Sequence, residues 1–171
     1  MELLAHHLAA TLVAVYLSKY HRMRGVISLS APVRKQDYIF LDPEKATDPA
    51  DPASTFSSND PDVLMERAVI DLAGHEAEHI YHIVNSSPDM AARFLEHEAI
   101  LNSAMESVSD LSVTRSELVM KALELVSRNW FAVRDLSRLM LICKNRAFNI
   151  HAATQRLDKI YGENSGGGHI E

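Results

Sequence analysis

The amino-acid sequence of 171 residues is poor in cysteine and has fewer basic than acidic side chains. Its single cysteine, Cys143, excludes an intramolecular disulfide and any metal site made of several cysteines. A reducing, cytoplasmic setting is therefore expected. Basic residues number 17 against 23 acidic ones, and the net charge of -6 argues against a nucleic-acid partner and against docking on a membrane of anionic lipid.

Long apolar runs and glycine-rich loops are also missing. The apolar stretch from Leu8 to Leu17 is too short to span a bilayer, and no basic residue precedes it as in a secretory signal. This stretch predicts a buried helix. The sequence contains no glycine-rich phosphate loop, which argues against a nucleotide cofactor and against an ATP-driven activity of this chain.

Helical periodicity dominates the rest of the sequence. Helices are predicted over 2–21, from Asp60-Pro61 to about residue 84, from Ser87-Pro88 to about residue 108, over 113–143 with a break near Asn129-Trp130, and over 150–161. Short strands are predicted over 26–30 and 38–41, and together they could form a hairpin. We therefore expect a mainly α-helical domain with a small β-hairpin or sheet near the N-terminal helix, and no strand after residue 90.

Two stretches differ from this helical pattern. Residues 42–62 hold four of the six prolines, each preceded by an aspartate, and predict a flexible loop. The glycine-rich end over 162–171 predicts a disordered tail. The expected organisation is a single helical domain over 1–161, with the loop inside it and the tail after it.

One local motif indicates a candidate metal site and a catalytic residue. His75-Glu76-Ala77-Glu78-His79 fits His-Glu-x-x-His, in which two histidines on one helix face bind Zn²⁺ while the glutamate holds the attacking water. A third ligand is needed, and Glu98 or Asp89 could supply it. In this interpretation Glu76 is the catalytic base of a zinc-dependent peptidase, and His75 and His79 are metal ligands.

The same residues also fit a plain polar helix face. A helical wheel places five polar residues on or near one side: Asp71, His75, Glu78, His79 and His82. A solvated surface of Glu–His pairs would look the same, and Glu78 is charged where working zinc motifs are normally uncharged. Glu76 falls at the edge of the apolar arc, so its carboxylate needs a partner or a raised pKa.

Several segments occur in an order that is informative as a whole. The first helix contains Ala5-His6-His7-Leu8-Ala9-Ala10, and Gly25-Val26-Ile27-Ser28-Leu29 follows it. Later segments are Leu72-Ala73-Gly74-His75-Glu76-Ala77-Glu78-His79, Ser86-Ser87-Pro88-Asp89-Met90-Ala91-Ala92, and the stretch from Arg128 to Leu136. This order, over about residues 3–158, resembles the peptidase domain of FtsH-type ATP-dependent zinc proteases and their stand-alone relatives.

The resemblance implies a helical metallopeptidase-like fold whose zinc helix has decayed. The family carries His-Glu-Ala-Gly-His in its first helix. Here His6 matches the first ligand, His7 stands in place of the catalytic glutamate, and Ala10 stands in place of the second histidine. Asp89 matches the third ligand. Hydrolysis by the family mechanism should then fail, which would make the chain a pseudoenzyme. A metal site rebuilt from His6, Asp89 and a histidine of the 75–79 motif is a further hypothesis.

Three functions follow from these alternatives. The first is a degenerate zinc-metallopeptidase-like domain that acts by binding a protein or peptide partner. The second is an active zinc peptidase that uses His75, Glu76 and His79. The third is a structural helical adaptor. If the resemblance holds, we expect the first helix to pack against the helix that begins near residue 61, with His6 near Asp89.

Overall fold

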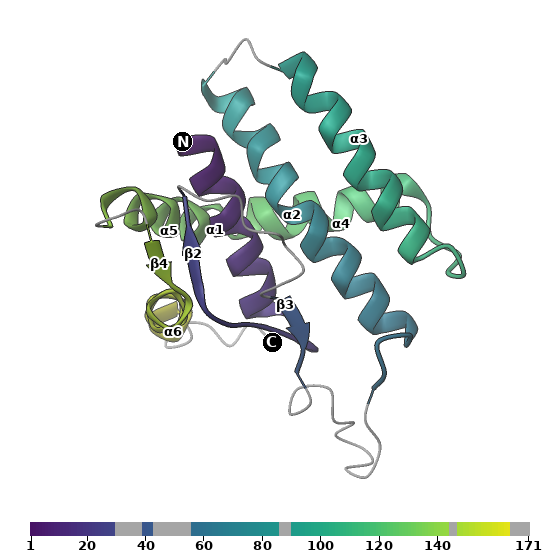
Figure 1. The fold of residues 1–171 in the computed structure, drawn as a ribbon, viewed down its shortest axis with the longest axis horizontal. Helices are drawn as coiled ribbons and strands as arrows, with labels where there is room; N and C mark the ends of the chain where they lie inside the picture. The colour runs from purple at the N-terminus through teal and green to yellow at the C-terminus, as the bar shows by residue number, and fades with distance from the viewer. Residues whose placement is uncertain (30–38, 43–55, 86–89, 144–146, 165–171) are drawn as a thin grey trace.

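The computed structural model describes residues 1–29, 39–42, 56–85, 90–143 and 147–164, which form a mainly helical domain with two small sheets (Figure 1). Its helices are α1 (Glu2–Leu17), α2 (Pro61–Asn85), α3 (Met90–Ser107), α4 (Arg115–Arg128), α5 (Trp130–Ile142) and α6 (Ile150–Asn164). Its strands are β1 (His21–Met23), β2 (Val26–Ser28), β3 (Ile39–Leu41) and β4 (Ala147–Asn149). The predicted fold class is therefore confirmed.

α1 lies at the centre of the domain. It packs most extensively against α2 and α5, while α2 also packs against α3 and α4 (Figure 1). The predicted contact between the first helix and the helix that begins near residue 61 is thus confirmed. Because neighbours cover α1 on several sides, every residue from Ala5 to Val15 except His6 is buried.

Proline at the first helical position explains the start of α2. The helix begins at Pro61, directly after Asp60, whose carbonyl accepts a hydrogen bond from the Leu64 N–H at 2.9 Å. Proline suits the first helical position because its missing N–H would have no partner there. This predicted boundary is confirmed. The start predicted at Ser87-Pro88 lies outside the described residues, and α3 is described from Met90 onward.

The predicted break near Asn129 is also confirmed. The Asn129 N–H donates to the Leu125 carbonyl at 3.3 Å, which closes α4, and the Asn129 carbonyl accepts from the Val133 N–H at 3.1 Å, which opens α5. One residue therefore serves both helix ends. Its backbone, at φ -108° and ψ 17°, departs from helical geometry and turns the chain between the two helices.

The strands pair differently from the predicted hairpin. β1 pairs with β3 and β2 pairs with β4, both antiparallel, so the hairpin prediction is wrong. The expectation of no strand after residue 90 is wrong as well, because β4 begins at Ala147. The register places Ile27 of β2 opposite Phe148 of β4, and both side chains are buried. Burial of this apolar pair stabilises the long-range pairing.

α1 ends before its predicted end at residue 21. Ser18 has an extended backbone, and its hydroxyl accepts from the His21 N–H at 2.9 Å and donates to the His21 carbonyl at 2.8 Å. This turn redirects the chain into β1. Gly25 follows with a φ of 99°, a left-handed value that favours glycine, in the connection between β1 and β2.

Two hydrophobic clusters meet at α2. One surrounds α1 and includes residues of α5 and α6, and the other joins α2 to α3 and α4. α2 contributes Ile70, Ala73 and Ala77 to the first cluster, and Val69 and Leu72 to the second. Two faces of α2 are therefore buried, and this burial sets the environment of the polar residues that the helix carries.

The remaining predictions concern loops and the membrane. Within the described residues, no helix combines the length and apolar character needed to cross a membrane. The predicted loop over 42–62 lies outside the described residues between 43 and 55. α6 runs to Asn164, beyond the predicted domain end at residue 161, and residues 165–171 lie outside the described residues.

Candidate metal centre

The polar residues in the middle of α2 do not form a solvated face. His75, Glu78 and His82 are 5%, 6% and 5% exposed, and Glu76 is 2% exposed. α1 packs against one side of this helix and α3 against another (Figure 1). The solvated-face prediction is therefore wrong for His75, Glu78 and His82, because a helical wheel tells which side chains share a side but not which helices cover that side.

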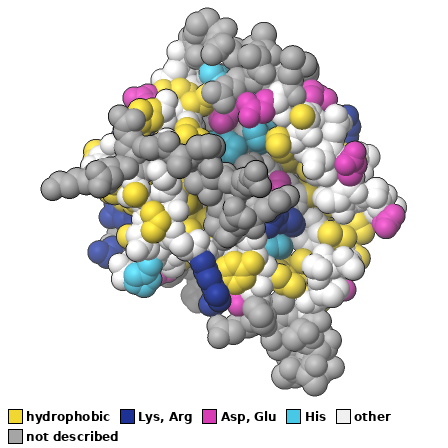
Figure 2. Space-filling view, viewed as in Figure 1, with side chains coloured by type: hydrophobic (Ala, Val, Ile, Leu, Met, Phe, Trp, Pro, Cys, Tyr) yellow, Lys and Arg dark blue, Asp and Glu magenta, His cyan; other side chains and the backbone are white. Residues whose placement is uncertain are grey.

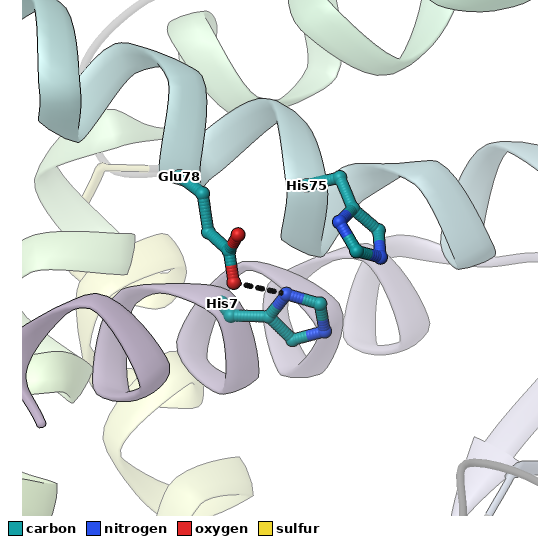
Figure 3. Close-up of side chains that lie close together, drawn as sticks. All are labelled: His7, His75 and Glu78. Atoms are coloured by element: carbon teal, nitrogen blue, oxygen red, sulfur yellow. Dashed lines mark hydrogen bonds and ion pairs between the residues drawn. The ribbon is translucent and has the colours of Figure 1, made fainter. Parts of the chain in front are cut away.

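Three buried side chains from two helices meet between α1 and α2 (Figure 3). These residues, His7, His75 and Glu78, are named here the α1–α2 cluster. Nδ1 of His7 lies 3.0 Å from Oε1 of Glu78, and the rings of His7 and His75 lie 4.8 Å apart at 89° to each other. The three residues offer one ligand atom each within 4.8 Å of one another. They therefore form a compact group of nitrogen and oxygen donors.

Gly74 explains how the His7 ring fits so close to α2. A Cβ atom at position 74 would lie 2.6 Å from Nε2 of His7 and 2.7 Å from two ring carbons. Real Cβ atoms do not approach ring atoms so closely, so any larger residue at this position would displace the imidazole. The glycine thus provides the space in which α1 places His7 beside His75 and Glu78.

Glu76, His79 and His97 form a second group, named here the α2–α3 cluster. Nε2 of His97 lies 2.9 Å from one carboxylate oxygen of Glu76, and Nδ1 of His79 lies 3.4 Å from the other. Burial raises the pKa of Glu76, but the hydrogen bonds to both imidazoles outweigh it, and the pKa falls to about 2. The bond to Glu76 raises the pKa of His79. Glu76 thus has the partners that its position in the sequence demands.

The His-Glu-x-x-His motif is divided between these two clusters. His75 groups with His7 and Glu78, whereas His79 groups with Glu76 and His97. Glu76, the predicted catalytic base, is held between two imidazoles. On the face shown in Figure 2, histidine side chains lie beside acidic ones above the middle of the view. The structure thus brings together Glu–His groups of a different composition from the one that the motif predicts.

The other predicted ligands lie apart from these clusters. Glu98 forms an ion pair with Arg115 of α4 at 2.6 Å, at the protein surface. Asp89 lies outside the described residues, and so does the predicted approach of His6 to it. The half-buried His6 donates from Nδ1 to the Glu2 carbonyl at 2.8 Å, and its ring stacks on Trp130 at 5.6 Å. Burial lowers the pKa of His6.

Sequence reasoning missed Glu78 and His97 as members of the clusters. The sequence indicates Glu78 as a residue of the polar helix face and as an irregularity of the zinc motif, and not as a ligand. His97 stands four, seven and eleven residues before Leu101, Ala104 and Val108, all of which are buried. That helical spacing places His97 on the buried face of α3 and could have shown that its ring needs a buried partner.

The residues at the positions of the family's zinc ligands do not fit a zinc ion in the family manner. Ala10 is fully buried in the core and offers no donor atom, and the Nδ1 atom of His6 is engaged by a backbone carbonyl. Comparison with known proteins adds no family, since the chain matches no family model, no curated protein and no solved structure. The resemblance to FtsH-type peptidases therefore stays a prediction.

Proposed function

We propose that this protein is a zinc-peptidase-like helical domain that does not hydrolyse peptides and acts by binding an extended segment of a polypeptide partner. One observation carries the loss of hydrolysis. At the two positions that match the family's second ligand and general base, the chain has a core alanine, Ala10, and an imidazole, His7, paired with Glu78. A methyl group cannot ligate zinc, and the paired imidazole does not replace a carboxylate that activates water.

The geometry around Glu76 supports the same conclusion for the second zinc motif. A general base must reach the water whose proton it takes, and its pKa should lie near the working pH. Both oxygens of Glu76 face imidazoles, and its pKa of about 2 makes it a weak base. The two histidines of the motif also belong to different clusters. An active peptidase built on residues 75–79 is therefore the less favoured alternative.

The proposed binding site lies where the strands meet α6. A cavity of about 510 Å³ opens there, with an apolar part lined by Leu12, Val15, Met23, Ile150 and Leu157. Within the described part of the chain, β1 pairs only with β3 and β2 only with β4, so each strand has a second edge without a strand partner. An extended segment can add to such an edge and place an apolar side chain in a neighbouring pocket.

The loss of hydrolysis is tested with the purified chain, equimolar zinc and an unfolded protein as substrate. We expect no zinc-dependent cleavage above that of the Glu76→Gln variant. Cleavage that disappears in Glu76→Gln while the bound zinc is retained would overturn the proposal, because Glu76 would then serve the attacking water and not the ion.

Partner binding is tested by fluorescence polarisation with a labelled unstructured polypeptide that contains apolar residues. Met23→Glu places a charge in the cavity, and we expect it to weaken binding about tenfold. Met120→Glu on α4 is the matched control, because Met120 is 58% exposed and does not line the cavity. Equal binding by both variants, or no binding by the unaltered chain, would favour the structural adaptor.

A further inference from the structure

The α1–α2 cluster contains a donor set that suits a transition metal. It combines two imidazoles with one carboxylate, contributed by two helices. Zinc is bound in proteins by histidine nitrogen and carboxylate oxygen, whereas calcium and magnesium prefer oxygen donors alone. The chemistry of His7, His75 and Glu78 therefore favours zinc or a neighbouring divalent transition metal over the hard cations.

The spacing of the donors also suits one ion. Zn–N bonds are about 2.0–2.1 Å and Zn–O bonds about 2.0–2.2 Å, so two ligand atoms on one tetrahedral zinc lie about 3.3 Å apart. Nδ1 of His7 and Oε1 of Glu78 are 3.0 Å apart, and His75 offers a ligand atom within 4.8 Å of a ligand atom of each of these residues (Figure 3). The three donors therefore lie near enough to one another for one ion to draw them together.

The cluster is held in place before any ion arrives. The His7 ring lies against the backbone at Gly74, at a distance that no Cβ would permit, so the ring has little freedom to turn away. Glu78 and His75 stand on the same buried side of α2, one turn of helix apart. Preorganised donors bind a metal more tightly because little conformational freedom is lost on binding.

The α2–α3 cluster is the weaker candidate for a metal. Its glutamate and histidines are hydrogen-bonded to one another, as His7 and Glu78 are in the α1–α2 cluster, so burial is what separates the two candidates. The side chain of His79 is 32% exposed. By contrast, all three members of the α1–α2 cluster are less than a tenth exposed. Three protein donors leave the fourth position of a tetrahedral zinc to a water molecule, and the burial of all three residues keeps larger molecules away from the ion.

We propose that His7, His75 and Glu78 form a structural binding site for a divalent transition metal, with zinc as the favoured ion, which clamps α1 to α2. This site differs in its residues and its role from the site of a zinc peptidase, and it does not depend on the binding of a polypeptide partner. An ion shared by two helices stabilises the folded chain because the unfolded chain cannot offer the same three donors together.

The first test measures zinc content and thermal stability of the full chain. The protein is stripped with a chelator, dialysed and titrated with zinc alone. We expect one zinc per chain and a rise in Tm of about 8 °C when free zinc exceeds its Kd about a hundredfold. Calcium and magnesium should produce no comparable rise. Absence of stoichiometric zinc, or an unchanged Tm with zinc, would overturn the proposal without reference to any variant.

The second test locates the ion. His75→Ala removes a donor of the proposed site, while His79→Ala removes a histidine of the neighbouring cluster and serves as the matched control. We expect His75→Ala to lower zinc affinity at least about a hundredfold and His79→Ala to leave it within about threefold. Glu78→Gln, which keeps the shape of the side chain, should weaken zinc binding as well. Zinc retained in His75→Ala, or lost equally in His79→Ala, would place the ion elsewhere and overturn the proposal.

Discussion

Both buried faces of α2 carry titratable side chains, and each face provides partners for them in a different way. Toward α1, the helix combines a close backbone approach at Gly74 with a group of donors around Glu78. Toward α3, it places one carboxylate, that of Glu76, between two imidazoles. The first face depends on the close fit at Gly74 as well as on the His7–Glu78 pair, whereas the second depends on the pairing of one carboxylate with two imidazoles. The comparison shows that a helix can bury several titratable side chains if each face supplies its own kind of partner.

The charged face should be the more sensitive to loss of a single group. Glu76→Ala removes a buried carboxylate and leaves two imidazoles without their acceptor, so we expect a loss of about 3 kcal/mol in the free energy of unfolding. Urea denaturation measures the change. Glu98→Ala is the control on α3, since that carboxylate is in a surface pair with Arg115 and should contribute less than about 1 kcal/mol. Equal effects of both substitutions would contradict a buried charge network.

The shape-dependent face should respond to one added methyl group. In Gly74→Ala the new Cβ would meet the His7 ring, and we expect a loss of about 2 kcal/mol in the free energy of unfolding. Gly162→Ala in α6 is the control, because nothing lies within 4 Å of a Cβ there and alanine favours the helix. The two glycine substitutions should therefore shift the urea midpoint in opposite directions. A Gly74→Ala protein as stable as the unaltered one would show that α1 and α2 adjust freely.

A carboxylate nearer the start of α2 adds a pH dependence to the α1 side. Glu66 accepts hydrogen bonds from the N–H groups of Lys19 and Tyr20 and pairs with His21 at 2.8 Å. Burial raises the pKa of Glu66, but these bonds outweigh it and the pKa lies below its ordinary value of 4.5. The folded state of the protein therefore favours the charged form of Glu66.

The sign of the pH effect follows from that lowered pKa. The stability contributed by Glu66 is present above pH 4.5 and is lost as the pH falls through the pKa of the folded state. We expect Glu66→Gln to cost about 1.5 kcal/mol at pH 7, and the difference from the unaltered chain to shrink as the pH falls below 4.5. Thermal unfolding followed by circular dichroism at several pH values measures it. A difference that stays constant down to pH 3 would assign the effect to packing instead.

His79→Ala should have the smallest effect of the four. The side chain is 32% exposed, and Glu76 keeps its shorter bond to His97 when His79 is removed. We expect a loss of about 0.5 kcal/mol in the free energy of unfolding. A double-mutant cycle with Glu76→Ala measures the coupling between the two side chains directly. A loss above about 2 kcal/mol would mean that the charged face depends on both of its histidines.

Local signals in the sequence predict the helices well. Asp60-Pro61 marks the start of α2 because aspartate followed by proline favours a helix start within a few residues, and Asn129 marks a break because the helical pattern falters there. Such local signals do not predict which strands pair. β2 and β4 are each three residues long, and their pairing depends on Ile27 and Phe148 meeting across most of the chain.

Local signals also do not predict which residues complete the candidate site. The motif over 75–79 places two histidines on one helix, but the clusters are completed by His7 from α1 and His97 from α3. Spacing within one helix carries no information about which side chains arrive from its neighbours. The burial of Glu76 could be foreseen from its place beside apolar residues, whereas the identity of its partners required the packing of α2 against α3.

The pairing of β2 with β4 also dictates an order of events while the chain is being synthesised. Ser28 leaves the ribosome about 120 residues before its partner Ala147, a delay of roughly 6–24 s at ordinary rates of translation. Throughout that interval Ile27, which is only 1% exposed in the finished fold, has no strand opposite it. Until then, Ile27 of β2 belongs to an apolar surface that β4, about 120 residues further along the chain, has to cover. A factor that protects apolar segments during translation would find Ile27 uncovered throughout that interval.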